Sequence, residues 1–248
     1  VHSFSRRVHA SKPLHLHSLA RHTFRKRRRR PRRRRLRIGS RRVKRVPAPP
    51  GWSGRFWART GCKFDPRATV VASRRLWRPN VLGGGAPPVT LVEFTIASGG
   101  RNDKDFYDVS LVDGWHWFLD VYDLWVDELR ISTQQVQCRH GRTALRQRHG
   151  DCQYAGCIAD LNGNCPQELQ VMSSGAVVAC KSACEAFDTP EFCCTGDHST
   201  PGTCSPTQYS EMFKNACPTA YSYAYDDASS TCTCAGSDYL ITFCPTGS

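Results

Sequence analysis

The chain has 248 residues, 14 cysteines and a formal net charge of +14 at pH 7. This length allows one large domain or two small ones, and the absence of a run of 18 apolar residues argues against a transmembrane segment. The positive charge is localised, because residues 1–50 hold 19 Lys/Arg and no Asp/Glu, whereas the remainder is mildly acidic. The net positive charge of the chain therefore comes from residues 1–50.

Residues 1–45 are rich first in histidine and then in arginine, which occupies positions 27–30 and 32–35. Such a block repels itself, so we predict a disordered basic segment that is not native to the domain. A phosphate-binding arm would be non-specific, and no folded recognition module is present, so we expect no nucleic-acid partner. The segment has no apolar stretch of the kind that a signal peptide needs, and we expect none in this chain.

The middle of the chain contains three predicted strands. Residues 55–60 alternate between polar and apolar, and residues 89–96 and 106–112 are rich in β-branched and aromatic side chains. The last two strands are joined by a turn and could lie in one sheet. Glu93 is the only charged residue of residues 89–96, so its carboxylate is either solvated on an outer face or held in a polar cleft.

The last third, residues 151–248, contains 12 of the 14 cysteines. This density is typical of a disulfide scaffold formed in an oxidising compartment. Zinc binding is the alternative, but the adjacent Cys193 and Cys194 and the lack of Cys-x-x-Cys pairs argue against a metal site. Short helices are predicted over residues 178–187 and 209–216, and a closing strand over residues 239–244.

Several runs in this third are specific enough to compare with known families: Gly156–Asn162, Cys165–Leu169, Cys180–Cys184, Glu191–Thr195, Phe213–Pro218, Ala220–Asp227 and Ile241–Pro245. They resemble plant thaumatin-like (pathogenesis-related) proteins, as do residues 46–64 and 83–114. The resemblance implies a mainly β fold, with a thaumatin-like β-sandwich and a disulfide-rich lobe of short helices and loops. Residues 46–248 would form this domain, with a partial sandwich over 46–150 and the lobe plus closing strands over 151–248.

The resemblance also implies a set of disulfides and no cofactor. The expected pairs are Cys152–Cys234, Cys157–Cys217, Cys165–Cys180, Cys184–Cys193 and Cys194–Cys204. Cys62, Cys138, Cys232 and Cys244 are left without an assigned partner.

Three segments depart from the family pattern: residues 1–45, about 65–82 and about 115–150. They lack family cysteines and are rich in Arg, His and Trp. We hypothesise that they were translated out of frame, which makes the N-terminal strands of the sandwich doubtful. A full-length transcript that encodes these segments, with peptides detected from them, would refute the hypothesis.

The family has an acidic cleft between sandwich and lobe, and the matching positions here are Arg55, Glu93, Asp108, Asp113 and Asp226. Asp226 is the weakest match because Asp227 adjoins it. Asp108 and Asp113 lie on opposite faces of a straight strand, so a shared cleft requires a bend at residues 113–114. Two carboxylates beside a sugar can hydrolyse a glycosidic bond, and for such a reaction we expect Glu93 as the acid and Asp113 as its partner.

The resemblance implies a secreted plant defence protein, extracellular or vacuolar, that acts against fungi as a monomer. It would bind β-1,3-glucan or a related fungal cell-wall polysaccharide through the acidic cleft. One alternative is a weak endo-β-1,3-glucanase that uses the same cleft, and another is a non-functional product of a frameshifted gene. A solvated acidic surface that binds sugar hydroxyls or cations without chemistry is the simplest explanation of the carboxylates.

Overall fold

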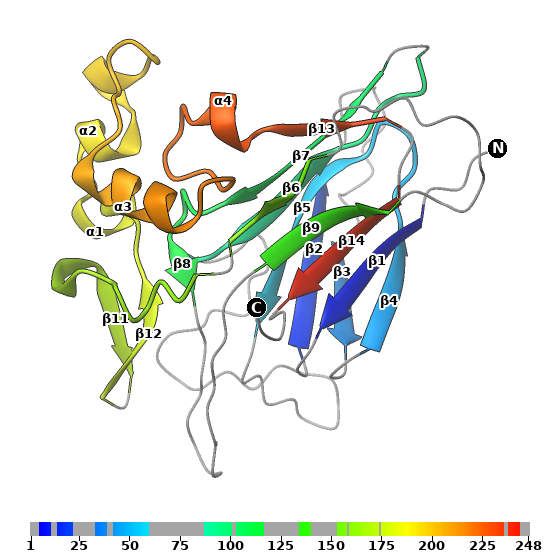
Figure 1. The fold of residues 1–248 in the computed structure, drawn as a ribbon, viewed down its shortest axis with the longest axis horizontal. Helices are drawn as coiled ribbons and strands as arrows, with labels where there is room; N and C mark the ends of the chain where they lie inside the picture. Colours follow the sequence, from blue (N-terminus) through cyan, green and yellow to red (C-terminus); the bar gives the residue numbers. More distant parts are fainter. Residues whose placement is uncertain are drawn as a thin grey trace.

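A computed structural model describes residues 5–10, 14–21, 33–38, 42–59, 87–100, 103–116, 134–139, 153–157, 159–173, 175–235 and 238–243. Two large β-sheets form a sandwich, and a lobe of short helices with a small third sheet lies beside it (Figure 1). The candidate site is on the six-stranded sheet.

The six-stranded sheet is antiparallel at every described pairing. Its order is β13 (Cys232–Cys234), β7 (Asp105–Ser110), β6 (Leu91–Thr95), β5 (Ser53–Arg59), β2 (Leu14–Arg21) and β3 (Arg33–Ile38). The predicted strands at residues 55–60, 89–96 and 106–112 correspond to β5, β6 and β7, with boundaries shifted by one or two residues. They lie side by side as expected.

The five-stranded sheet has the order β10 (Ala155–Gly156), β9 (Gln134–Arg139), β14 (Asp238–Phe243), β1 (Ser5–Ala10) and β4 (Arg42–Pro47). The closing strand predicted over residues 239–244 is β14. It is parallel to β1, and its other neighbour, β9, is antiparallel to it.

The described part of residues 1–45 forms strands β1, β2, β3 and most of β4, which differs from the disordered segment that we expected. Charge repulsion was the basis for that expectation. In the structure, however, β2 pairs with β5 and β1 pairs with β14. The backbone groups at the edges of β5 and β14 are thereby satisfied. The origin of the segment stays a hypothesis, and residues 65–82 lie outside the described residues.

The core between the two sheets contains a cluster of three aromatic rings. Phe94 lies 5.0 Å from Tyr239 and 5.9 Å from Tyr107, measured between ring centroids. The Tyr239 hydroxyl donates a hydrogen bond of 2.7 Å to Asp105, and the amide of Ala97 donates one of 2.8 Å to the other carboxylate oxygen. Asp105 is therefore a buried carboxyl group whose oxygens are both satisfied inside the fold.

The lobe, drawn in yellow and orange in Figure 1, combines short helices with a three-stranded sheet. The sheet has the order β11 (Gln170–Ser173), β12 (Ala176–Cys180) and β8 (Trp115–His116). The helical elements are η2 (Gln167–Leu169), α1 (Ala183–Phe187), α2 (Pro190–Cys193), η3 (Gly196–His198), α3 (Gln208–Ala216) and α4 (Asp227–Ser230).

One predicted helix of the lobe is confirmed and the other needs correction. The helix predicted at residues 209–216 is α3, which begins after Thr207 with a capping box. Residues 178–180, in contrast, belong to strand β12, and the helix starts only at residue 183. The boundary has a clear cause, because the hydroxyl of Ser182 accepts a hydrogen bond from the amide of Glu185 and caps the new helix.

Four of the five expected disulfides are present. They are Cys157–Cys217, Cys165–Cys180, Cys184–Cys193 and Cys194–Cys204. Cys234 is also disulfide-bonded, but its expected partner Cys152 lies outside the described residues, as do Cys62 and Cys244. Cys138 lies in β9, and the buried Cys232 has its Sγ 3.8 Å from the carbonyl oxygen of Tyr154.

Candidate ligand-binding cleft

Three charged residues form a row across neighbouring strands on the outer face of the six-stranded sheet. The strand register places Arg55 of β5 opposite Glu93 of β6, and Glu93 opposite Asp108 of β7. Directly opposite residues in a sheet share a face. The next residues along β5 and β6, Phe56 and Phe94, point inward and are buried. The alternation of each strand thus brings charges that are far apart in the sequence to one surface.

Arg55 connects Glu93 of this row with Asp113 beyond it. Its Nε lies 3.1 Å from Oε1 of Glu93, and a terminal nitrogen lies 4.0 Å from Oδ2 of Asp113. The side chain of Arg55 is 19% exposed, whereas those of Glu93 and Asp113 are 35% and 41% exposed. The guanidinium is therefore largely covered, and the carboxylates keep access to solvent.

The bend that Asp113 requires is present after β7. The strand ends at Ser110, and the carbonyl of Asp113 accepts a hydrogen bond of 2.8 Å from the amide of Val89. Gly114 then adopts a φ of +80°, and a Cβ at this position would lie 2.7 Å from Cβ of Pro88 and 3.0 Å from the amide nitrogen of Ser182. A glycine is needed here both for its backbone conformation and for the close approach of the lobe.

Asp108 is the least satisfied carboxylate of the row. The side chain is half-buried, and among the residues that the structure describes, no hydrogen-bond partner reaches its buried Oδ1. Burial raises the pKa of Asp108 to about 8; repulsion from Glu93 adds to the increase and Arg55 opposes it. Burial also raises the pKa of Asp113, against the influence of Arg55. Asp108 consequently holds a proton near neutral pH.

The carboxylate of Asp226 is engaged in hydrogen bonds and an ion pair within the protein. Asp226 does not line the hollow described below. Its carboxylate accepts hydrogen bonds from the amide and hydroxyl of Ser222, at 3.0 and 3.1 Å, and from Ser229 at 2.8 Å. Lys214 forms an ion pair with it at 2.9 Å. Burial alone would raise the pKa of Asp226, but Lys214 and these hydrogen bonds bring it below its ordinary value.

The adjacent Asp227, in contrast, interacts electrostatically with Asp108 of the row. Its Oδ1 accepts a hydrogen bond of 2.9 Å from the Tyr221 hydroxyl, and its charge contributes to the raised pKa of Asp108. Tyr221 is attached directly to β7, since its amide and carbonyl bond to Val109 and Leu111. The sequence alone does not separate the two members of the pair, because both residues are acidic and adjacent.

Glu185 is a further acidic group that sequence reasoning missed. It lies in the first turn of α1, three residues after Ser182, the capping residue that Gly114 approaches. Burial raises the pKa of Glu185, and the charge of Asp113 adds to the increase. The lobe thus contributes a carboxylate to the acidic surface at its boundary with the sandwich. The only sequence signal was the Ser182-x-x-Glu185 spacing of a helix cap.

An open hollow of about 220 Å³ lies over the charged row. Its lining consists of Ser53, Gly54, Arg55, Glu93, Phe94, Thr95, Phe106 and Asp108. Asp113 and Asp226 are not part of this lining, so the structure gathers three of the five expected residues in the hollow and holds a fourth, Asp113, through Arg55.

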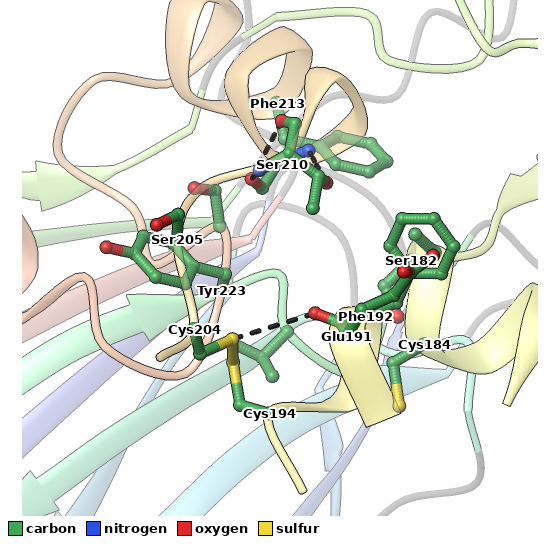
Figure 2. A pocket seen from close by; sticks show the side chains of 14 residues that line it. Ser182, Cys184, Glu191, Phe192, Cys194, Cys204, Ser205, Ser210, Phe213 and Tyr223 are labelled. Atoms are coloured by element: carbon green, nitrogen blue, oxygen red, sulfur yellow. Dashed lines mark hydrogen bonds between the residues drawn. A yellow bond between two sulfur atoms is a disulfide. The ribbon is translucent and has the colours of Figure 1, made fainter. Parts of the chain in front are cut away.

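A second cavity lies within the lobe (Figure 2). Figure 2 shows Ser182, Ser210, Phe213 and Tyr223 around it, with the Cys194–Cys204 disulfide at one side. Its volume is about 20 Å³, which accommodates one water molecule. A sugar cannot enter a space of this size, so the lobe cavity is a feature of packing.

Two other kinds of feature are absent from the part of the chain that the structure describes. No group of three or more His, Cys, Asp or Glu residues is placed to hold a metal ion there. Among the same residues, no helix is long and apolar enough to cross a membrane.

Comparison with known proteins identifies the family. The model of the thaumatin family matches residues 22–245. This chain belongs to the thaumatin family. Pathogenesis-related protein 5 of Arabidopsis thaliana is 52% identical over 205 residues, which cover 82% of this chain and 75% of that protein. Pathogenesis-related thaumatin-like protein 3.5 of Cryptomeria japonica is 52% identical over 206 residues, covering 81% and 73%.

Another thaumatin-family relative carries the name of an enzyme. A glucan endo-1,3-beta-glucosidase of Prunus avium is 48% identical over 214 residues, which cover 84% of this chain and 78% of that protein. Among solved structures, a thaumatin-like xylanase inhibitor covers 97% of this chain at 13% identity with a TM-score of 0.38, a likeness too distant to support an argument. The family match and the observed strands confirm the mainly β, thaumatin-like fold, and the names of the plant relatives support a role in plant defence.

Proposed function

We propose that this thaumatin-family protein binds β-1,3-glucan, or a related fungal cell-wall polysaccharide, through the outer face of the six-stranded sheet. The observation that carries the proposal is the row of Arg55, Glu93 and Asp108 beneath an open hollow of about 220 Å³. Binding sites for small ligands combine such a depression with a few convergent polar groups.

The chemistry of the row suits a neutral, hydroxyl-rich ligand. Glu93 and Asp113 accept hydrogen bonds from sugar hydroxyls, Arg55 donates them, and protonated Asp108 can do both. A neutral sugar also avoids the repulsion that these carboxylates would exert on an anion. The ordinary role of carboxylates on a surface is solvation, but the carboxyl group of Asp108 lines the hollow and holds a proton near neutral pH, so it can donate a hydrogen bond to a ligand hydroxyl.

The setting is that of a secreted antifungal defence protein, extracellular or vacuolar and monomeric. The four disulfides support an oxidising compartment. The names of the relatives support the defence role.

A weak endo-β-1,3-glucanase activity is the second candidate. The name of the Prunus avium relative favours it, as does the pairing of a proton-holding Asp108 with a Glu93 that forms an ion pair with Arg55. Cross-strand partners have Cβ atoms about 4.5–5.5 Å apart, so the two carboxyl groups can flank one glycosidic bond, as both classes of glycoside hydrolysis require. We therefore assign the acid role to Asp108 and the nucleophile role to Glu93, in place of Glu93 with Asp113.

Binding and hydrolysis are tested with laminarin, a soluble β-1,3-glucan. The wild type, Glu93→Gln and Asp108→Asn are compared by calorimetric titration, with the exposed lobe variant Glu168→Gln as control. We expect binding to weaken about tenfold or more in the two cleft variants and to be unchanged in the control. Equal binding by all four proteins contradicts the binding site, and no binding by a folded wild type favours a non-functional product.

Reducing-sugar release from laminarin separates the two functions. If the protein is an enzyme, release should require both Asp108 and Glu93. Equal release by the wild type and Glu93→Gln would remove Glu93 from the mechanism, and no release by a wild type that binds laminarin would leave a binding protein.

A further inference from the structure

A second row of residues lies beside the charged row on the same face of the sheet. The register places Ser53 of β5 opposite Thr95 of β6, and Thr95 opposite Phe106 of β7. Each member is two residues away from its counterpart in the charged row, so the two rows point to the same side. They differ in chemistry, since one is ionic and the other contains two hydroxyls and a phenyl ring.

The side chain of Phe106 is exposed to solvent, whereas the side chains on either side of it in β7 are buried. It is 49% exposed, whereas Tyr107 beside it is 1% exposed. A single exposed apolar residue is common on protein surfaces. Phe106, however, lines the same hollow as Glu93 and Asp108, so the lining contains an aromatic ring as well as ionisable groups.

The hydroxyl groups of the second row retain capacity for a ligand. Oγ of Ser53 and Oγ1 of Thr95 are 3.1 Å apart and share one hydrogen bond at an exposed position. Each hydroxyl has one donor and two acceptor sites. After their mutual bond, one donor and three lone pairs remain for sugar hydroxyls or water.

The two rows lie close enough together for one sugar chain to contact both. Two residues along an antiparallel strand span about 6.8 Å, a distance that adjacent rings of an oligosaccharide can bridge. A chain that places one unit over the charged row can therefore place its neighbour over the second row.

We propose that Phe106, together with Ser53 and Thr95, forms a second sugar subsite, in which one face of a glucosyl ring packs on the phenyl ring. This inference rests on the proposed function and extends it to a specificity-determining residue. A β-glucosyl ring has equatorial hydroxyls and apolar C–H faces, so it covers an aromatic ring without burying an unsatisfied hydroxyl. A ring with an axial hydroxyl packs less closely, and the subsite selects against it.

The test compares the affinity of four proteins for laminaritriose by calorimetric titration. They are the wild type, Phe106→Ala, Phe106→Tyr and Met172→Ala. Met172 is a matched control because it is an apolar residue of the lobe that is 55% exposed. We expect Phe106→Ala to weaken binding about tenfold, Phe106→Tyr to remain within about threefold of the wild type because the ring is kept, and Met172→Ala to bind as the wild type does.

The outcomes distinguish this inference from the proposed function. If the wild type binds and Glu93→Gln weakens binding, but Phe106→Ala binds equally well, the second subsite is wrong and the charged site stands. If the wild type does not bind laminaritriose or laminarin, both are wrong. Thermal unfolding of each variant is measured in parallel, and the recovery of affinity in Phe106→Tyr shows that a loss in Phe106→Ala comes from the missing ring. If Phe106→Tyr is as weak as Phe106→Ala, stacking is contradicted.

Discussion

The lobe and the outer face of the sandwich use their carboxylates in opposite ways. In the lobe, Asp226 is 8% exposed and is satisfied by Lys214, Ser222 and Ser229. On the sandwich, Asp108 is half-buried with an oxygen that no described residue satisfies. The first arrangement adds to stability, and the second lowers it while leaving a group available to a ligand. The comparison shows that burial alone does not distinguish a structural acid from a functional one, whereas hydrogen-bond satisfaction does.

Removal of a disulfide should produce the largest loss of stability. We expect this loss to concern the lobe and to leave ligand binding unchanged. Replacing both Cys157 and Cys217 by serine removes a bridge with a sequence separation of 60 residues, the longest of the four that lie within the described residues. We expect a loss of about 2–5 kcal/mol in the free energy of unfolding, measured by chemical denaturation. Laminarin affinity of the protein that remains folded should not change, and a selective loss of affinity would contradict the separation of roles.

Lys214→Met should have the next largest effect. Besides the ion pair with Asp226, the ammonium group donates to the carbonyl of Ala220 at 3.1 Å and to Ser230 at 2.7 Å. All three donors of the lysine are thus used. Removing them leaves Asp226 buried without its counter-charge, and we expect a loss of about 2–4 kcal/mol, reduced from the fully buried case because Lys214 is partly exposed.

The pH dependence of this variant gives an independent check. The pKa of Asp226 is lowered in the folded protein, so its stabilising contribution is present above the ordinary pKa of aspartate and is lost as pH falls through the folded value. The difference in stability between the wild type and Lys214→Met should therefore shrink as the solution is made acidic. A difference that is constant from neutral to strongly acidic pH would contradict this origin.

Gly114→Ala tests the connection between the two regions. The added methyl group meets Pro88 and the backbone of Ser182 at distances that require movement, and the φ of +80° is unfavourable for alanine. We expect a loss of about 2–3 kcal/mol in unfolding free energy. Because the turn also positions Asp113, laminarin affinity should fall too, whereas Gly202→Ala, which meets no atom within 4 Å, should change neither.

Asp108→Asn should have the smallest effect on stability. It should raise the free energy of unfolding, whereas the other substitutions lower it. The pKa of Asp108 rises from 3.8 to about 8 on folding, so between these values the native state keeps a proton that the unfolded state has lost. Native stability consequently falls as pH rises through this window. We expect the variant to be about 1–3 kcal/mol more stable than the wild type at pH 8, with equal stability near pH 3. Equal stability at both pH values, measured by thermal unfolding, would show that Asp108 is not buried as described.

The disulfide pairs of the lobe were predicted because the resemblance to the family implies them, and helix α3 was predicted from its local sequence. The members of the row, Arg55, Glu93 and Asp108, were also named from the resemblance. Glu93 had a further signal, because it is the only charged residue of an apolar strand and was expected at a cleft or on an outer face. The register that aligns the three strands was visible only in the structure.

The remaining features depend on contacts between distant segments. Asp226 and Asp227 have the same chemistry and differ only because Lys214 of α3 lies beside the first. Glu185 joins the acidic surface because Gly114 approaches the start of α1. Residues 1–45 had a composition that favoured disorder, but within them β1 pairs with β14 and β2 pairs with β5, and such pairing over a long sequence separation cannot be inferred from charge.

The position of β14 has a consequence for how the protein is made. This strand is close to the C-terminal end of the chain, yet it is the central strand of its sheet, between β9 and β1 (Figure 1). Arg7 is paired with Leu240, so the ladder joins segments from opposite ends of the chain. During synthesis, β1 and β9 each lack one neighbouring strand until β14 has been made, and folding limited by such distant contacts is slow. An unpaired strand edge can associate with another chain, and pairing with β14 ends this exposure.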